Sequence, residues 1–343
     1  MRKKALWVSP HWHLVLLTLV LFYDILKGTK DRRLAMYSFI VNPNASGGRG
    51  ERIWRRLEKQ LKHLGVPYEA FVTEKTGDAR RLACDLTEHQ REPRILIAVG
   101  GDGTVSEVLD GISFCGPVTL GYIPTGSGND LARSLRLPKS PSRCLKKILN
   151  PKYHKLLDYG VLSYGDHLTH RRFMVSTGIG MDAMVCQDIL HSKTKRGLSK
   201  VGLGKLSYML VGAKRILFTR PVKGYLVLDG AQKVEFNHIY FVSVHNHGSE
   251  GGGFLFAPRA VCDDGELELC VAHTASKLRL FPVLFDAYRG HLGRRRGVHF
   301  YRCKEAVIHV DQPMPVHADG ENCFCQEEVR VRCVKKKLRM ILQ

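Results

Sequence analysis

The chain has 343 residues, with 53 Lys and Arg against 32 Asp and Glu, which gives a formal net charge of +21. This length accommodates two domains and excludes a miniprotein held together by disulfides. Hydrophobic residues make up 44% and charged residues 25% of the chain, which excludes disorder of the whole chain. The positive charge indicates an anionic partner, either a nucleic acid, a nucleotide or the anionic surface of a membrane.

The ten cysteines are scattered and form no CxxC pair. The closest two, Cys323 and Cys325, are separated by a single residue. Structural zinc sites normally need repeated pairs with two to four residues between the ligands. We therefore expect no zinc cluster, and we expect reduced thiols of the kind found in cytoplasmic proteins.

Residues 1–35 differ from the rest and are treated as an N-terminal extension. Basic residues at positions 2–4 precede the apolar stretch Leu14–Tyr23, and more basic residues follow it. That stretch is too short to span a bilayer, which needs about 20 apolar residues, and no small-residue cleavage motif follows it. Three interpretations stay open: a helix on a membrane surface, a disordered tail, and a translation start at Met36 instead of Met1.

Residues 36–157 are predicted to form an α/β domain with a parallel sheet. Short buried strands alternate with stretches of helical periodicity, and this order indicates right-handed crossovers. The predicted strands are Tyr37–Val41, Tyr68–Val72, Ile95–Val99 and Val118–Ile123, and the predicted helices cover Arg52–Leu64, begin near Asp78 and follow Thr104.

Residues 158–343 are predicted to form a second domain of a different class. Runs rich in β-branched and aromatic residues follow one another with few helices between them, which is typical of a mostly antiparallel β-sandwich. Two helices are expected, over 203–218 and 276–291, and the end of the chain is expected to pack back on the first domain.

The sharpest motif is Gly100-Gly101-Asp102-Gly103-Thr104, between a predicted strand and a predicted helix. Glycines at such a junction let backbone N–H groups approach phosphate oxygens, and the helix N-terminus adds a partial positive charge. The motif has neither the GxxxxGK[ST] nor the GxGxxG pattern. It predicts a phosphate-binding loop of another type.

A second polar, glycine-rich turn, Pro124-Thr125-Gly126-Ser127-Gly128-Asn129-Asp130, follows the next predicted strand. Loops at the carboxyl ends of strands in one parallel sheet open onto the same crevice. With a third such turn at Asn42–Gly48, they predict three walls of one nucleotide site.

These motifs resemble the diacylglycerol kinase catalytic-domain family, which includes soluble bacterial diacylglycerol kinases, related bacterial lipid kinases and sphingosine kinases. The resemblance continues through Thr177–Ala183, Gly251-Gly252-Gly253 and Asp263-Asp264-Gly265, and it ends at Asp319-Gly320-Glu321. It covers the chain from about residue 37 onwards. It implies a first domain like those of phosphofructokinase and NAD kinase.

The resemblance also implies roles for individual residues, with ATP and Mg²⁺ as the cofactors. Asp319 matches the general base, and Asp102, Asp130 and Asp158 match a network around the nucleotide-bound magnesium. Asp264, with the carbonyls of Val261 and Glu266, matches a second magnesium site, although the family usually has an apolar residue where Glu266 stands. The implied ATP-binding residues are Asn42, Ser46, Gly47, Thr73, Gly101, Asp102, Gly103, Thr104, Val105, Ser106, Glu107, Ser127 and Glu321.

Some of these acidic residues also have ordinary structural interpretations, which stay open. Asp158 could cap a domain junction, Asp263-Asp264-Gly265 is a good β-turn sequence, and Asp319-Gly320 is a strong hairpin signal. Ser127 stands where the family usually has Thr. Both side chains carry a hydroxyl group, so a hydrogen bond at this position is kept.

The expected function is transfer of the γ-phosphoryl group of ATP to a lipid hydroxyl, first of all that of diacylglycerol to give phosphatidate. The protein would then be cytoplasmic and bound to the anionic inner face of the membrane through basic residues around the two predicted helices of the second domain: Lys193, Lys195, Arg196, Lys200, Lys205, Lys214, Arg215, Arg220, Arg289 and Arg294–Arg296.

Two alternatives are an NAD kinase-like activity on a soluble acceptor and a nucleotide sensor without turnover. A nucleic-acid-binding protein would suit the charge but would leave the glycine loops unexplained, so no nucleic acid partner is expected. The sequence does not decide which lipid is used, or whether the protein is a monomer or a homodimer.

Overall fold

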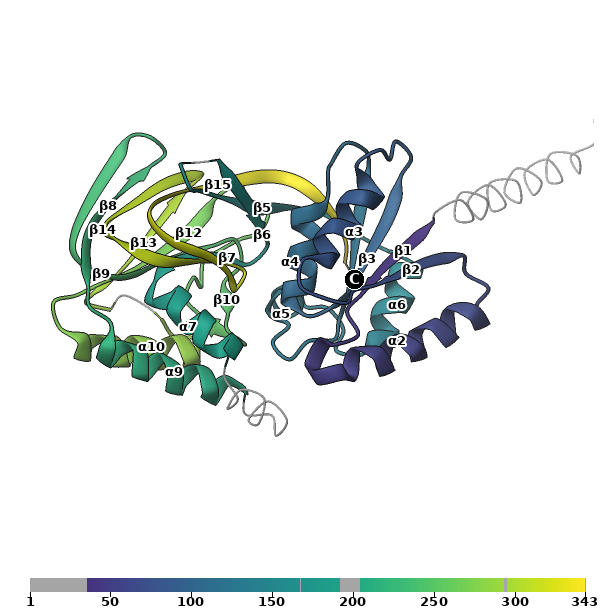
Figure 1. Ribbon diagram of the computed structural model, residues 1–343, viewed down its shortest axis with the longest axis horizontal. Helices are drawn as coiled ribbons and strands as arrows, with labels where there is room; N and C mark the ends of the chain where they lie inside the picture. The colour runs from purple at the N-terminus through teal and green to yellow at the C-terminus, as the bar shows by residue number, and fades with distance from the viewer. Residues whose placement is uncertain (1–35, 167, 192–203, 293–294, 343) are drawn as a thin grey trace, which may run out of the picture.

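A computed structural model describes residues 36–166, 168–191, 204–292 and 295–342, which form two lobes joined side by side (Figure 1). The N-terminal extension lies outside the described residues, as do the basic residues Lys193, Lys195, Arg196, Lys200 and Arg294.

The first lobe is a parallel sheet in the order β4-β3-β1-β2 with helices on both faces. Alternate residues of each strand point to opposite faces, so Phe39 packs against α2 and α6 while its neighbour Ile40 packs against α3 and α4. The elements are β1 (Tyr37–Val41), α2 (Ala45–His63), β2 (Tyr68–Val72), α3 (Asp78–Thr87), β3 (Arg94–Gly100), α4 (Asp102–Gly111), β4 (Val118–Pro124), α5 (Asp130–Ser134) and α6 (Pro141–Leu149).

The second lobe is built mainly from antiparallel strands that curve around one apolar core. Both β9 and β14 pair with β7 and with β8, which closes this part of the sheet on itself. The strands are β5 (His154–Tyr164), β6 (Thr169–Phe173), β7 (Ser176–Gly180), β8 (Val222–Leu228), β9 (Gln232–His245), β10 (Ser249–Glu250), β11 (Phe254–Leu255), β12 (Leu267–His273), β13 (Val298–Cys303), β14 (Glu305–Ala318) and β15 (Glu321–Ile341). The predicted fold class, an α/β domain followed by a β-sandwich domain, is confirmed.

Helices α7 (Met181–His191), α9 (Gly204–Phe218) and α10 (Leu280–Arg289) lie together along one side of the second lobe (Figure 1). Their inner faces share a cluster of buried side chains with β9 and β12, among them Met181, Ile216, Val283, Phe241 and Cys270. None of the helices described is both long and apolar enough to cross a membrane.

The local structure differs from the sequence prediction in two helices. The helix expected from Arg52 begins earlier, at Ala45, but its first turn is distorted because Ser46, Gly47 and Gly48 have φ values of 51°, 68° and 90°. The helix expected over 276–291 is shorter, since a 3₁₀ turn η1 (Lys277–Arg279) precedes α10, and Gly290, with φ 75°, ends it.

Strand β15 joins the two lobes. Most of its length pairs with β14 and β5 in the second lobe, while Arg339 and Met340 pair in parallel with Thr119 and Leu120 of β4. As a result, 13 strands from both lobes form one hydrogen-bonded network, while β10 and β11 pair separately with each other.

The end of β15 should therefore contribute strongly to stability. We expect Leu338→Ala to lower the free energy of unfolding by about 2 to 5 kcal/mol, because Leu338 is fully buried in the core of the first lobe. Leu156→Ala, on the paired strand β5 but 48% exposed, should change it by less than about 0.5 kcal/mol. Urea unfolding followed by circular dichroism measures both, and equal losses would contradict this role of β15.

Candidate active site

The two glycine-rich loops meet at the ends of β3 and β4. A Cβ atom added to Gly126 would lie 2.6 Å from the Cα atom of Gly101, so the two loops approach closely enough that a side chain there forces them apart. The Asp102 carboxylate bridges them, because it accepts hydrogen bonds from the backbone N–H groups of Asp130 (3.0 Å) and Leu131 (3.2 Å) at the start of α5.

The third loop, Asn42–Gly48, is fixed to the two glycine-rich loops by side-chain hydrogen bonds. The Asn42 amide donates to the Thr104 hydroxyl (3.0 Å), and the Ser46 hydroxyl donates to the backbone carbonyl of Thr125 (2.9 Å). Glu107 accepts from the N–H groups of Gly77 (3.0 Å) and Ala79 (3.2 Å), which holds the start of α3 against α4.

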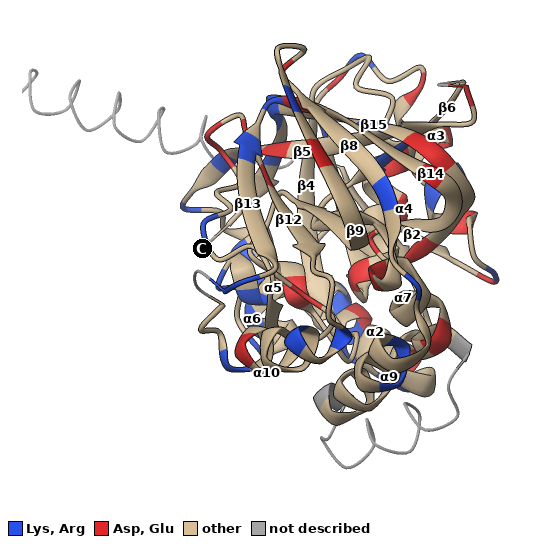
Figure 2. Ribbon diagram, turned by 90° about the vertical axis from the view of Figure 1, so that its left-hand side faces the viewer, with Lys and Arg blue, Asp and Glu red and all other residues tan. Residues whose placement is uncertain are grey.

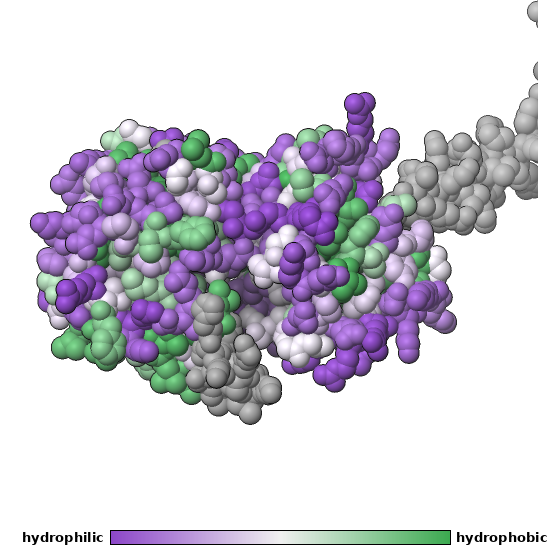
Figure 3. Space-filling view, in the orientation of Figure 1, coloured by the Kyte–Doolittle hydropathy of each residue, from purple (hydrophilic) through white to green (hydrophobic). Residues whose placement is uncertain are grey.

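These loops line a cavity between the lobes, referred to below as the polar cavity, and Figure 3 shows the molecule hollowed at this place. Three predicted nucleotide-contacting residues do not line it: Gly47, Val105, which is buried in the core of the first lobe, and Ser106, which points to Asp319. The predicted site residues that do line it are Asn42, Ser46, Thr73, Gly101, Asp102, Gly103, Thr104, Glu107, Ser127, Asp130, Asp319 and Glu321.

Asp102 and Asp130 form an acidic pair on the wall of the polar cavity. Burial, together with the neighbouring charge of Asp130, raises the pKa of Asp102 to about 6. Asp130 also accepts a hydrogen bond from the N–H of Gly252 (2.7 Å) and pairs with Arg133. A divalent cation beside these carboxylates would relieve their repulsion, so the donor set fits a nucleotide-bound Mg²⁺.

Asp158 is not brought together with that pair. It lines neither cavity, and its fully buried carboxylate accepts the backbone N–H groups of Gly265 (2.6 Å) and Lys336 (2.6 Å). The position corresponds to the alternative interpretation of Asp158 as a structural cap, here of the turn before β12 and of an irregular part of β15.

Asp319 lies in the turn between β14 and β15, where both Asp319 (φ 48°) and Gly320 (φ 83°) adopt the left-handed conformation of a tight hairpin. Its carboxylate accepts hydrogen bonds from the Ser106 hydroxyl (2.6 Å) and from the N–H groups of Met174 (2.6 Å), Val175 (2.8 Å) and Ser176 (2.9 Å). Burial raises the pKa of Asp319, and these hydrogen bonds oppose that rise.

A second cavity, the apolar cavity, opens beside Asp319 in the second lobe. Its walls come from α7, α9, α10 and β11, with side chains such as Tyr208, Ile216, Phe254 and Leu284. Asp102, Asp130 and Asp319 line both cavities. The two cavities therefore meet at these three carboxylates.

The polar end of the apolar cavity contains residues that the sequence analysis missed. His317 bonds to Asp182 (Nε2 to Oδ2, 2.9 Å) and accepts the N–H of Gly320 (3.1 Å), so it supports the turn that carries Asp319. Glu250 accepts the Ser176 hydroxyl. One signal in the sequence was available, since His317 stands two residues before Asp319, at the end of the strand that leads into the turn.

Comparison with known proteins decides the family. Residues 36–160 match the model described as the diacylglycerol kinase catalytic domain, and residues 174–342 match the YegS C-terminal NAD kinase beta sandwich-like domain. A "Probable lipid kinase YegS-like" of Chromohalobacter salexigens is 30% identical over 273 residues, which are 78% of this chain and 81% of the relative. The chain belongs to the diacylglycerol kinase catalytic-domain family. The predicted resemblance is thereby confirmed.

Other members of the diacylglycerol kinase catalytic-domain family agree in length and fold. A diacylglycerol kinase of Mycobacterium tuberculosis is 28% identical over 286 residues, which cover 82% of this chain and 87% of the relative. The crystal structure of a diacylglycerol kinase from Bacillus anthracis superposes with a TM-score of 0.62 at 18% identity, over 90% of this chain and 97% of that chain. This second likeness concerns the fold.

The second metal site that resemblance to the diacylglycerol kinase catalytic-domain family implied does not fit the residues around Asp264. Oδ2 of Asp264 is paired with Arg302, and Oδ1 accepts the N–H of Glu266 (3.0 Å). The Glu266 carboxylate, where the family usually has an apolar residue, lies 2.9 Å from the same guanidinium. A guanidinium thus stands where a cation would balance these carboxylates.

The pairing of Arg302 with Asp264 and Glu266 can be tested through thermal stability. We expect excess Mg²⁺ or EDTA to change the thermal midpoint of Arg302→Met more than that of the unmodified protein, because only the variant leaves Asp264 and Glu266 without a cation. Differential scanning calorimetry of both proteins without nucleotide measures the two shifts. Any binding at Asp102 and Asp130 is common to both, and equal shifts would contradict the role given to Arg302.

Proposed function

We propose that this lipid kinase family member transfers the γ-phosphoryl group of ATP to the hydroxyl group of diacylglycerol, giving phosphatidate. The observation that carries the proposal is that Asp319 lines both the polar and the apolar cavity. A phosphate chain held by the glycine loops and a hydroxyl on a lipid in the apolar cavity would therefore meet beside one carboxylate.

Each group at this meeting point has a chemical task. Backbone N–H groups at the start of α4 bind the phosphates, and Asp102 and Asp130 would hold the magnesium, which neutralises charge on the phosphoryl group as it transfers. Asp319 accepts the proton of the lipid hydroxyl as general base. Among its four donors, the Ser106 hydroxyl is the one on a freely rotating bond, so it can turn away when the substrate hydroxyl approaches.

The apolar cavity favours a lipid over a soluble acceptor. Aromatic and aliphatic side chains of α7, α9, α10, β9 and β11 line one part of it, and acidic residues lie at the end near Asp319. A dinucleotide such as NAD carries negative charge and many hydrogen-bonding groups, which such a wall cannot satisfy. An acyl chain needs neither.

We expect Asp319→Asn to lower the rate of lipid phosphorylation by about 100-fold or more while Mg-ATP still binds, because the substrate loses its proton acceptor. The assay follows labelled γ-phosphate into a panel of lipids in mixed micelles, with NAD present as a soluble acceptor. Asp85→Asn, an exposed carboxylate on α3, is the matched control and should stay within twofold of the unmodified protein.

Transfer of the label to a different lipid would support the same mechanism with a different substrate. Label in NAD would favour the NAD kinase-like alternative, and no label in any acceptor would favour a nucleotide sensor. Either of the last two results contradicts the proposed function.

We also propose that the protein binds the anionic face of a membrane, and the surface around the apolar cavity supports this proposal. Large apolar side chains on α9, η1 and α10 are exposed, including Phe218 (72%) and Leu278 (72%). Figure 3 shows apolar side chains gathered over α9 and α10, and Figure 2 shows Lys and Arg on the same helices. We call this set the α9–α10 surface: Leu206, Leu210, Leu217, Phe218, Leu278, Phe285 and Tyr288, with the exposed basic residues Lys214, Arg220, Arg279 and Arg289.

Helices α9 and α10 present this surface outwards and the cavity wall inwards. These two helices therefore separate the proposed membrane contact from the apolar cavity by a single layer of helices. Basic residues near an anionic surface each add roughly 1 kcal/mol of attraction. Apolar side chains among them add burial in the interface.

We expect the double variant Leu210→Glu/Phe218→Glu to reduce cosedimentation with phosphatidylglycerol vesicles by tenfold or more. Its activity on a short-chain lipid dissolved in water should stay within about twofold, because neither side chain lines the apolar cavity. Leu64→Glu, 57% exposed on the first lobe, is the matched control for an added charge. Equal vesicle binding by all three proteins would contradict membrane contact through the α9–α10 surface.

A further inference from the structure

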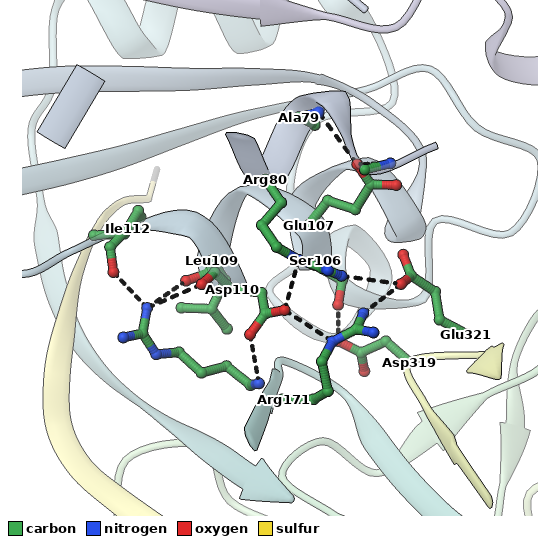
Figure 4. Close-up of polar contacts among 12 residues, drawn as sticks. Ala79, Arg80, Ser106, Glu107, Leu109, Asp110, Ile112, Arg171, Asp319 and Glu321 are labelled. Carbon is green, nitrogen blue, oxygen red and sulfur yellow. Dashed lines mark hydrogen bonds and ion pairs between the residues drawn. The ribbon is translucent and has the colours of Figure 1, made fainter. Parts of the chain in front are cut away.

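Four charged side chains from both lobes form a closed ion cluster at the edge of the polar cavity: Arg80, Asp110, Arg171 and Glu321 (Figure 4). Oδ2 of Asp110 lies 2.8 Å from Nε of Arg80, as an ion pair, and accepts a hydrogen bond from Nε of Arg171 (2.8 Å). Glu321 is bonded by Nη2 of Arg80 (3.4 Å) and by Nη2 of Arg171. Each carboxylate thus contacts both guanidinium groups, and the four charges cancel.

The cluster is largely removed from water. The side chains of Asp110, Arg171 and Glu321 are 8%, 14% and 21% exposed, while Arg80 is 36% exposed. Removing one partner of a buried charge pair leaves the other charge unpaired in a poorly solvated place, which is strongly unfavourable. Of the two arginines, Arg171 is therefore the better-buried link between the carboxylates.

Arg171 belongs to the same chain segment that holds Asp319. Three residues after Arg171 the segment reaches Met174, whose N–H begins the run of amides bonded to the Asp319 carboxylate. The segment 171–176 thus contacts the β14–β15 turn at two places. Its backbone amides bond to Asp319, and the Arg171 side chain bonds to Glu321.

Helix α4 of the first lobe contacts the same turn and the Arg171 side chain. Ser106 and Asp110 are one helical turn apart and lie on one face, and they reach Asp319 and Arg171 respectively. The neighbouring Arg172 donates its backbone N–H to Asp110 (2.8 Å) and its side chain to the Leu109 carbonyl at the end of α4 (3.0 Å). The opposite end of α4 is the phosphate loop.

We propose that Arg171 is a positioning residue, which acts through Glu321 to hold the β14–β15 turn in register with α4 and hence with the bound nucleotide. The proposal rests on the proposed function, since it assigns Glu321 to the nucleotide side and Asp319 to the acceptor side of one transfer. Without Arg171 the turn keeps only the longer Arg80–Glu321 contact (3.4 Å) as a charged contact with the first lobe, although the amides of 174–176 still hold Asp319.

The test is a double-mutant cycle with Arg171→Met, Glu321→Gln and both together, measured as kcat and as KM for ATP. We expect each single variant to raise KM for ATP and to lower kcat/KM by roughly tenfold to a hundredfold, as displacements of about 1 Å in a transfer site do. The double variant should be no worse than the more impaired single variant, because both changes remove the same Arg171–Glu321 contact. Arg171→Lys, which keeps the charge but not the two-pronged contact, should fall in between.

Arg81→Met is the matched control, an arginine of α3 whose ion pair with Asp85 lies on the exposed surface, and it should leave both constants within twofold. Effects of the two single variants that multiply in the double variant would overturn the proposal, as would normal kinetics of Arg171→Met. If Arg171→Met does not fold, the same cycle with Arg171→Lys gives the answer. Should the unmodified protein phosphorylate no lipid, the proposed function fails, and the cycle is measured as Kd for Mg-ATP by calorimetry.

Discussion

The Asp319 carboxylate accepts hydrogen bonds from backbone amides of the second lobe and from Ser106 of the first, so both lobes fix the same side chain. Because an ionised carboxylate is costly to bury without donors, this arrangement constrains the whole interface. It places α4, the β14–β15 turn and the segment 174–176 within hydrogen-bond distance of one another. Strand β15, which pairs with strands of both lobes, also connects them.

This constraint explains why two cavities of opposite character meet at one point. The first lobe supplies glycine loops and helix N-termini, which suit phosphate, and the second lobe supplies apolar helices, which suit an acyl chain. Neither lobe alone contains both. The ion cluster of Arg80, Asp110, Arg171 and Glu321 adds a second connection beside the first, so the turn that carries Asp319 is attached to α4 at two positions.

Much of the first lobe could be predicted from the sequence, because strand-to-helix turns with glycines are local patterns. The glycine loop at the start of α4 and the parallel sheet follow from such patterns, and Asp319-Gly320 indicates a hairpin turn. Contacts between distant residues could not be predicted: Arg171 and Glu321 are 150 residues apart, and nothing near either indicates the other. Asp158 shows the same limit. The residues next to it in the sequence do not indicate whether its carboxylate caps backbone amides, as it does here, or lies beside a metal. Arg302 likewise looks ordinary until β13 places it against Asp264.

The most direct measurement is a crystal structure with a non-hydrolysable ATP analogue, Mg²⁺ and a short-chain diacylglycerol. We predict the acyl chain in the apolar cavity and the free hydroxyl within about 3 Å of a carboxylate oxygen of Asp319, facing the terminal phosphate above the start of α4. A lipid bound elsewhere, or a hydroxyl separated from Asp319 by more than one water molecule, would contradict the central claim that both lobes place this carboxylate for the transfer.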